Sequence, residues 1–250
     1  MVYLPRFFNL SIPVNKSHPT LPPEVEIRQT VTKGYSLFAT SGIPAGTLLF
    51  AESPLITIKH DDTDLQLLIQ QSLAAVEPHR IRSFYNLHNA HHRWTRSSSR
   101  TGGAAAQAHG MTIEAGIWLT NCFLISTSTS AIFDAMSRIN HSCIPNVEME
   151  WCEERGLMGV FAKRDLIAGD EVCRSYFEEE VGHRLVDVRR EYLKGGWAFE
   201  CGCKRCVNEA AYWTAKNRVA VVGENGIGVG VGVGVCAGLD GRGRSVKIGA

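Results

Sequence analysis

The sequence lacks any run of about 18 apolar residues, which is the length that a helix needs to cross a membrane. It also lacks a marked excess of charge, because 26 Lys and Arg residues balance 25 Asp and Glu residues to a net charge of +1. A chain so close to neutrality has no overall field that would attract nucleic acid or an anionic membrane surface. We therefore expect neither direct nucleic acid binding nor a membrane-spanning segment.

A basic leader is also missing before the apolar part of the opening residues, MVYLPRFFNLSIPVNK. We interpret them as mature sequence rather than as a signal peptide, and we expect a monomer in the nucleus or cytoplasm. Eight cysteines are not expected to form a disulfide framework in such a compartment, where clustered cysteines more often bind a metal ion.

Alternating apolar residues indicate strands in several parts of the chain. Residues 25–58 contain EIRQTV, SLFAT and TLLFAESPLITI, with turn residues between them. Residues 146–151 and 157–163 flank CEERG and predict a hairpin, and a short strand is expected over residues 171–177. The hydrophobic content of 44% is enough to build a sizeable core around these strands.

A helical period appears in two places. Residues 64–76 place five apolar side chains on one face: Leu65, Leu68, Ile69, Leu73 and Val76. Residues 181–194 form a second helical pattern, which Gly195 is placed to end. The Ser-, Gly- and Ala-rich residues 95–110 predict a mobile loop. Beyond residue 222 a GVGVGVGV pattern has little side-chain volume to offset backbone entropy, and it predicts disorder.

The strongest chemical signal is Cys201-Gly202-Cys203-Lys204-Arg205-Cys206. Three thiolates at C-x-C-x2-C spacing can converge on one tetrahedral zinc ion, and a closed structural site needs a fourth ligand. No further Cys or His follows closely, so the fourth ligand should come from elsewhere in the chain. The alternative is three buried or incidental cysteines without a metal ion. The candidates for the fourth ligand are Cys122, Cys143, Cys152, Cys173 and Cys236.

Two further segments carry polar residues between apolar ones. The first is RINHSCIPN, over residues 138–146, and the second is GDEVCRSYF, over residues 169–177. Taken alone, His141 beside Asn140 is typical of a structural histidine, and Pro145 is typical of a turn. Each segment is a weak signal alone, and the more specific signal is their order along the chain, in which WAFECGCKRC follows both of them.

This ordered set resembles the SET-domain protein-lysine methyltransferases, most of all the branch related to SET and MYND proteins, although the insert shows no MYND-finger pattern. KGYSLFATSGIPAGTLLFAESPL is similar to the first SET strands, and GIWLTNCFLI to the strand that closes the insert. The resemblance spans about residues 25–207. It implies a mainly β fold, the SET β-clip, with small sheets and a knot-like threading of the last SET segment.

The expected division follows from the resemblance and the composition. It consists of an N-terminal arm (1–23), the SET domain (24–177, with a helical insert at about 60–118), a helical connection (178–196), a zinc-bound post-SET segment (197–209) and a low-complexity, disordered tail (210–250).

The resemblance also implies roles for individual residues. Tyr176 matches the catalytic tyrosine that lines the lysine channel, and Cys143 matches the fourth zinc ligand beside Cys201, Cys203 and Cys206. The residues that would bind S-adenosylmethionine are Lys33, Gly34, Tyr35, Asn121, Asn140, His141, Tyr176 and Phe199.

The implied function is methylation of a lysine side chain of a histone or another protein. Two departures from the family pattern support an alternative, a catalytically weak module that acts as a binding or scaffold protein. Ser36 stands where the family usually has a glycine, and Trp197 stands where relatives often carry a tyrosine. The Gly- and Val-rich end leaves open a third interpretation, a truncated or wrongly assigned gene product.

Overall fold

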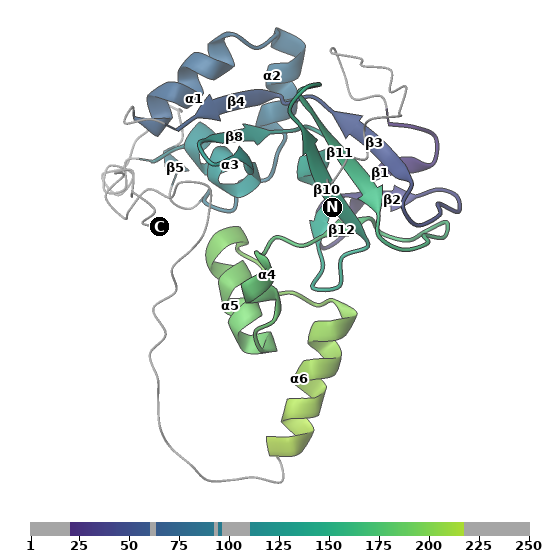
Figure 1. The fold of residues 1–250 in the computed structure, drawn as a ribbon. Helices are drawn as coiled ribbons and strands as arrows, with labels where there is room; N and C mark the ends of the chain where they lie inside the picture. The colour runs from purple at the N-terminus through teal and green to yellow at the C-terminus, as the bar shows by residue number, and fades with distance from the viewer. Residues whose placement is uncertain (1–20, 61–63, 93–94, 97–110, 218–250) are drawn as a thin grey trace.

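The computed structural model describes residues 21–60, 64–92, 95–96 and 111–217 (Figure 1). Its elements in chain order are β1 (Val25–Thr30), β2 (Gly34–Ala39), β3 (Leu48–Glu52), β4 (Ile56–Lys59), α1 (Leu65–Ala74), α2 (Pro78–Tyr85), β5 (Thr95–Arg96), β6 (Met111–Thr112), α3 (Ile113–Asn121), β7 (Phe123–Ser126), β8 (Thr129–Ile132), η3 (Met136–Arg138), β9 (Asn140–His141), β10 (Val147–Cys152), β11 (Leu157–Ala162), β12 (Cys173–Arg174), α4 (Glu179–Gly182), α5 (Val186–Trp197) and α6 (Lys204–Asn217).

The strands form several small sheets, as the sequence predicts. β1 pairs with β2, β10 and β3 flank β11, and β4 and β7 flank β8. The predicted hairpin is confirmed, with Val147 opposite Ala162 and Cys152 opposite Leu157. β12 pairs in parallel with β9. That pairing sets the last segment of the β domain against the loop that begins at Asn140, which is the contact that the expected threading requires.

The insert builds an apolar cluster of its own between helices α1 and α3 and strand β4. Asp64 starts α1 by accepting the backbone N–H of Leu67, and Ile69 and Leu73 then face the buried Trp118 of α3. The residues of the predicted helix 64–76 therefore form a helix with the expected buried face. Among the helices of the described residues, none has the length and apolarity to cross a membrane.

Four elements differ from the sequence expectation. GIWLTN belongs to α3, and only the following residues form strand β7. These apolar residues have no clear period, and the helix is set by Thr112, whose hydroxyl accepts the N–H of Ala115. The strand expected over residues 171–177 is limited to β12, where backbone pairing with β9 is available.

Helix α5 does not end at Gly195 but continues to Trp197. Ala198 then adopts a left-handed conformation with φ of 59°. The last turn forms because the Trp197 ring packs against Tyr192 and Tyr176, which stabilises the helix beyond its two glycines.

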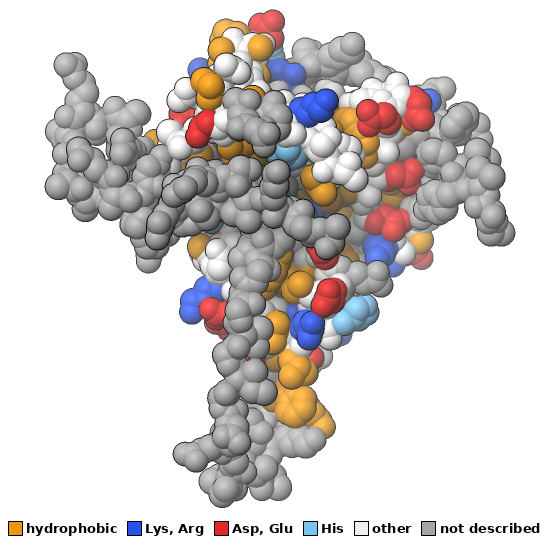
Figure 2. All heavy atoms as spheres, turned by 60° about the vertical axis from the view of Figure 1, so that its left-hand side comes forward, with side chains coloured by type: hydrophobic (Ala, Val, Ile, Leu, Met, Phe, Trp, Pro, Cys, Tyr) orange, Lys and Arg blue, Asp and Glu red, His pale blue; other side chains and the backbone are white. Residues whose placement is uncertain are grey.

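Helix α6 begins inside the cysteine motif and continues to Asn217, past the expected boundary at residue 209. Its sequence is rich in good helix formers, and Cys206, Ala210 and Trp213 recur at helical spacing in one apolar cluster. α6 projects from the lower end of the molecule in Figure 1, and Figure 2 shows hydrophobic side chains on that lower part. Val207 and Tyr212 of α6 are exposed. Of the loop expected over residues 95–110, Thr95–Arg96 form strand β5 and residues 97–110 lie outside the described residues. Most of the arm and the Gly-rich tail also lie outside them.

Glu52, at the end of β3, is a buried side chain that holds the backbone of residues 134–136. Its oxygens accept the backbone N–H groups of Asp134, Ala135 and Met136, at 2.7, 3.1 and 3.1 Å. Met136, the last of the residues that carry these N–H groups, begins η3, which is followed by Asn140 in β9. Burial raises the pKa of Glu52 from 4.5 to about 7, although the three N–H groups act in the opposite direction.

A raised pKa makes Glu52 a source of pH-dependent stability. The folded protein retains a proton between pH 4.5 and about 7 that the unfolded chain releases, so this contribution is lost as pH rises through that window. We expect the difference in melting temperature between wild type and Glu52→Gln to change across the window. Glu26→Gln, on the half-exposed pair with Arg28, is the control and should show no such change. A difference that stays constant with pH for Glu52→Gln would contradict this role.

Candidate functional site

The loop from Ile139 to Asn146 lies beside the segment from Glu171 to Tyr176. In the parallel pairing Asn140 lies opposite Cys173, and His141 lies opposite Arg174. The Asn146 side chain secures the arrangement from the other end of the loop. Its amide donates to the carbonyl of Glu171 at 2.8 Å, and its oxygen accepts the N–H of Cys173 at 2.7 Å. Two segments distant in sequence thus form one rigid wall.

A cavity of about 970 Å³ opens against this wall, which is large enough for a cofactor-sized molecule. The structure brings all the sequence-predicted cofactor residues together around it. The described residues that line it include Lys33, Gly34, Tyr35, Asn121, Asn140, His141, Tyr176 and Phe199. Arg174, Glu171 and Trp197 also line it, as do residues 86–89 of the insert.

His141 connects the wall to the cysteine cluster. Its Nδ1 accepts the backbone N–H of Tyr176 at 3.0 Å, and its Nε2 lies 3.3 Å from the Cys143 sulfur. Burial lowers the pKa of His141 to about 3, so the ring is neutral at physiological pH. Since Nδ1 accepts a hydrogen bond, the single proton resides on Nε2 and points to the sulfur.

Tyr176 is enclosed by aromatic rings and one cation. Its ring centre lies 5.1 Å from that of Trp197 and 6.3 Å from that of Phe199. The Arg174 guanidinium lies 4.2 Å from the centre of the Tyr176 ring. The hydroxyl donates to the carbonyl of Ile139 at 3.0 Å. Burial raises the pKa of Tyr176, so the phenol stays protonated and can orient a neighbour but not act as a base.

The amide of Asn140 donates to the Ser36 hydroxyl at 2.5 Å and to Glu171 at 3.0 Å. Glu171 also forms an ion pair of 2.5 Å with Lys33. Ser36 is fully buried and is not among the described residues that line the cavity. The side chain that departs from the family glycine is therefore turned toward Asn140, where it helps to orient the amide.

Asn121 sits at the end of α3, where its amide donates to the carbonyls of His88 and Ile117, both at 2.7 Å. These bonds join α3 to the end of the insert. Trp197 makes a similar link from the other side, because its indole N–H donates to the Thr120 carbonyl at 3.0 Å. The insert and the segment before the cysteines are thus joined at the cavity.

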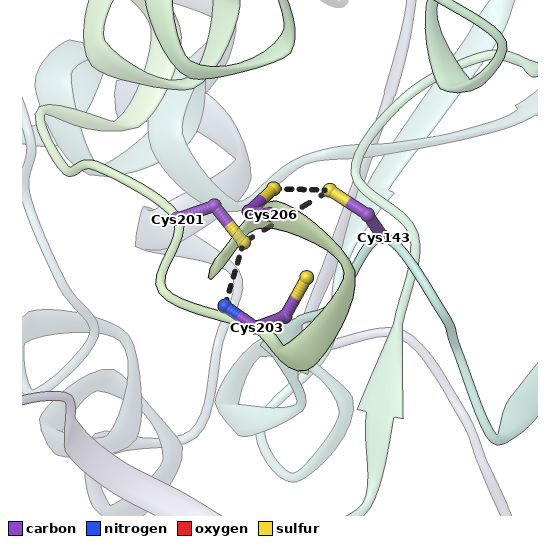
Figure 3. Close-up of side chains that lie close together, drawn as sticks. All are labelled: Cys143, Cys201, Cys203 and Cys206. Carbon is purple, nitrogen blue, oxygen red and sulfur yellow. Dashed lines mark hydrogen bonds between the residues drawn. The ribbon is translucent and has the colours of Figure 1, made fainter. Parts of the chain in front are cut away.

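The four predicted cysteines, Cys143, Cys201, Cys203 and Cys206, form a compact cluster (Figure 3). All four sulfurs lie within 4.8 Å of one another, and Cys143 is 3.4 Å from Cys206 and 3.9 Å from Cys201. A tetrahedral zinc ion at about 2.3 Å from each sulfur would separate the sulfurs by about 3.8 Å. The donor set therefore fits a four-coordinate metal site. Cys122, Cys152 and Cys173, the other candidates within the described residues, lie outside this cluster.

The thiols of the cluster differ in acidity. Hydrogen bonds with Cys201 and Cys203 raise the pKa of Cys143, whereas hydrogen bonds from Cys143 and Cys201 lower that of Cys203. The raised pKa favours the protonated form of the Cys143 thiol. Metal binding displaces such protons, so affinity for a metal ion falls in acid.

Comparison with known proteins gives the decisive match: residues 34–177 match the SET domain. The chain belongs to the SET-domain family. The match begins at β2 and ends just after Tyr176, so it contains the two paired segments at Asn140 and Cys173, whereas Lys33, Trp197 and Phe199 of the cavity lining lie outside it. Three of the cysteines, in the post-SET segment, follow it.

Several relatives carry the names of lysine methyltransferases. Histone-lysine N-methyltransferase set5 of Schizosaccharomyces pombe is 30% identical over 188 residues, which are 74% of this chain and 52% of the relative. Histone-lysine N-methyltransferase SET5 of Meyerozyma guilliermondii is 40% identical over 88 residues, 34% of this chain and 18% of the relative. The human protein-lysine N-trimethyltransferase SMYD5 is 36% identical over 81 residues, which are 32% of this chain and 19% of the relative. The matched part spans about half of the first relative and about a fifth of the other two.

Some residues of the SET cavity were not expected from the sequence. Arg174 looks like an ordinary strand residue, and its place between the rings of Phe123 and Tyr176 depends on contacts from separate elements. Residues 86–89 belong to an insert without a recognisable motif. Trp197, in contrast, was expected near the site, because it stands where relatives often carry a tyrosine, and it does line the cavity.

The indole N–H of Trp197 gives a test of the link between the insert and the post-SET segment. Trp197→Phe keeps an aromatic ring but leaves the carbonyl of the buried Thr120 without this donor. We expect the free energy of unfolding to fall by about 1 to 3 kcal/mol in chemical denaturation. Trp151→Phe is the control, because its indole bonds to the exposed Glu153. Equal losses in the two variants would argue against a specific link.

Proposed function

We propose that this protein is an S-adenosylmethionine-dependent protein-lysine N-methyltransferase with one structural zinc ion. The observation that carries the proposal is the convergence of Tyr176, the Asn140–His141 pair and Phe199 on one cavity beside the cysteine cluster. The names of the set5 and SMYD5 relatives support a protein substrate, a histone or another protein.

The cavity fits the proposed methyl donor in size and in character. Tyr35 and Phe199 offer aromatic surface for an adenine ring, while Lys33 and Asn140 offer polar groups for an amino acid end. S-adenosylmethionine, when bound, supplies a methyl group on a positively charged sulfur. The remaining requirement on the protein is to hold a lysine amine in line with that methyl group.

The lysine must be neutral to act as a nucleophile, yet its ordinary pKa is about 10.4. A channel walled by the rings of Tyr176, Trp197 and Phe199 disfavours the charged ammonium because it excludes water. The Arg174 guanidinium against the Tyr176 ring adds a fixed positive charge that acts in the same direction. No side-chain base is then needed, and the proton leaves to water before transfer.

Tyr176 orients the amine in this mechanism. Its own proton is directed to the Ile139 carbonyl, so the lone pairs of its oxygen are left to accept an N–H of the incoming lysine. The backbone bond to His141 holds the position of Tyr176. The four cysteines take no part in the transfer. A zinc ion held by them would order the post-SET segment and so place Phe199 and Trp197 against the cavity.

A methylation assay tests the proposal directly. The purified protein is incubated with labelled S-adenosylmethionine and a protein mixture that contains histones, and donor binding is measured separately by calorimetry. Label incorporated into lysine supports the enzyme. Donor binding without any transfer would favour the catalytically weak binding module, and absence of donor binding would contradict the cofactor assignment.

Tyr176→Phe tests the orienting role. We expect methyl transfer to fall by roughly 100-fold or more, because an interaction aimed at the transition state is lost, while donor affinity stays near that of the wild type. Tyr212→Phe, on the exposed part of α6, is the control and should transfer at the normal rate. Transfer by Tyr176→Phe at the wild-type rate would remove Tyr176 from the mechanism.

Metal analysis of cysteine variants tests the zinc site. We expect one zinc ion per chain in the wild type and in Cys152→Ser, and loss of the ion from Cys143→Ser and Cys206→Ser, because a tetrahedral site needs all four thiolates. The same losses should lower donor affinity by loosening the segment that carries Phe199. Full zinc content in Cys143→Ser would refute the assignment of the fourth ligand.

A further inference from the structure

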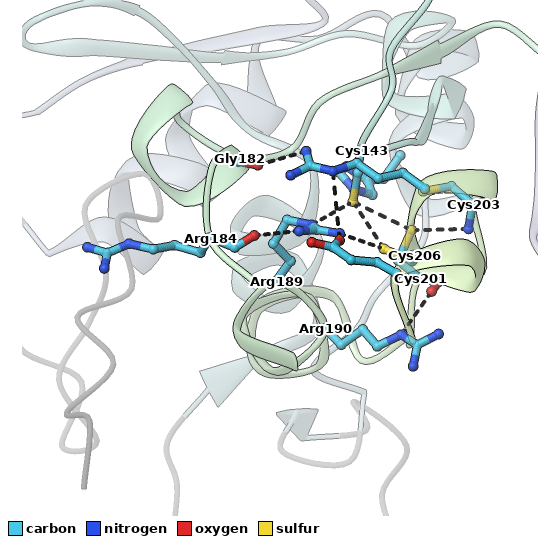
Figure 4. A network of polar contacts seen from close by, with 11 residues as sticks. Cys143, Gly182, Arg184, Arg189, Arg190, Cys201, Cys203 and Cys206 are labelled. Atoms are coloured by element: carbon cyan, nitrogen blue, oxygen red, sulfur yellow. Dashed lines mark hydrogen bonds and ion pairs between the residues drawn. The ribbon is translucent and has the colours of Figure 1, made fainter. Parts of the chain in front are cut away.

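Arg189 of α5 is a fully buried arginine beside the cysteine cluster (Figure 4). Its guanidinium lies where four parts of the chain meet. Nη1 donates to the Arg184 carbonyl in the turn before α5, and Nη2 forms a 2.5 Å ion pair with Glu209 of α6. The remaining contacts are with the sulfurs of two of the proposed zinc ligands.

Those contacts select two particular cysteines. Nε donates to the Cys143 sulfur and Nη2 to the Cys206 sulfur, each at 3.4 Å. Cys143 comes from the SET loop and Cys206 from the first turn of α6, so this pair joins the two halves of the cluster. The planar guanidinium spans the junction with donors in a fixed geometry, which a lysine could not reproduce.

Charge gives a reason for a cation at this place. Four thiolates around a divalent ion carry a net charge of −2, and buried charge is costly unless it is paired and hydrogen-bonded. Arg189 is the fully buried cation among the described residues, and its N–H groups are directed at sulfur. Glu209 alone could neutralise the arginine, but an ion pair with Glu209 does not require any N–H to face the cysteines.

The neighbouring Arg190 shows what an arginine without this role does. Its side chain reaches the same segment, but it donates to the backbone carbonyl of Cys201 and pairs with the exposed Glu200. Unlike Arg189, it does not donate to the sulfur of Cys143 or Cys206. The two adjacent residues therefore form a natural comparison on one helix.

We propose that Arg189 is a positioning residue of the zinc site, which holds the Cys143 and Cys206 thiolates together by two N–H···S hydrogen bonds and balances part of their charge. The inference rests on the zinc assignment of the proposed function and not on methyl transfer. Groups that hydrogen-bond to metal ligands commonly contribute a factor of 10 to 100 in metal affinity. Arg189 is expected to act on that scale.

The test uses the full chain loaded with Zn²⁺ and a chromogenic chelator that reports the release of the ion. Arg189→Met, which keeps an unbranched apolar stem but has no donors or charge, should release zinc roughly 10- to 100-fold faster than the wild type. The rate of zinc release from Arg189→Lys should lie between those of the wild type and Arg189→Met, because lysine restores the charge but not the paired donors. Arg190→Met is the matched control and should release zinc at nearly the wild-type rate.

A spectroscopic readout separates this role from general destabilisation. In the Co²⁺-substituted protein, loss of N–H···S bonds should shift the thiolate-to-cobalt charge-transfer band for Arg189→Met but not for Arg190→Met. In the ¹¹³Cd-substituted wild type, the Arg189 Nε proton should couple to the metal through the Cys143 sulfur, which tests the contact even if a variant does not fold.

Three results would overturn the inference. Zinc release and band position unchanged in Arg189→Met would show that the sulfur contacts have no effect. Equal acceleration in Arg190→Met would show a general effect of α5, and absence of the ¹¹³Cd coupling in the wild type would remove the hydrogen bond itself. A wild-type protein that binds neither Zn²⁺ nor Co²⁺ would instead refute the metal assignment, and this inference with it.

Discussion

The site depends on the contacts of the Cys143 sulfur with Cys201 and Cys206, which follow it by 58 and 63 residues in the sequence. On one side this sulfur contacts the cysteines that follow α5, and on the other it accepts a hydrogen bond from the Nε2–H of His141. The opposite nitrogen of that ring holds the backbone of Tyr176. A displacement of the Cys143 sulfur would therefore be transmitted to the catalytic candidate through a single neutral imidazole.

The neutrality of His141 matters to this arrangement. Burial keeps the pKa low, so the ring always has one donor and one acceptor. A protonated ring would lose the acceptor at Nδ1 and release the Tyr176 backbone. The aromatic rings of Phe177 and Phe199 that lie near His141 supply the apolar surroundings that maintain this state. Phe199, which lines the cavity, thus also helps to keep the His141 ring neutral.

Much of the site could be predicted because its motifs lie in short ordered segments. The C-x-C-x2-C spacing predicted three ligands, and the family resemblance selected Cys143 from five candidates; all four sulfurs meet in the structure. Spacing alone could not find a partner so far away in sequence. Arg189 was missed because an arginine in a charged helix usually faces solvent, and its burial depends on Glu209 and on sulfurs from other segments. Glu52 was missed for the same kind of reason, since η3 supplies the N–H groups that hold it.

The participation of the insert in the cavity has a consequence for divergence within the family. Residues 86–89 contribute to the rim, and the Thr120 carbonyl anchors Trp197 from outside the segments that carry the reacting groups. Replacement of the insert by another sequence would therefore change the cavity lining at residues 86–89 and the hydrogen bond that holds Trp197.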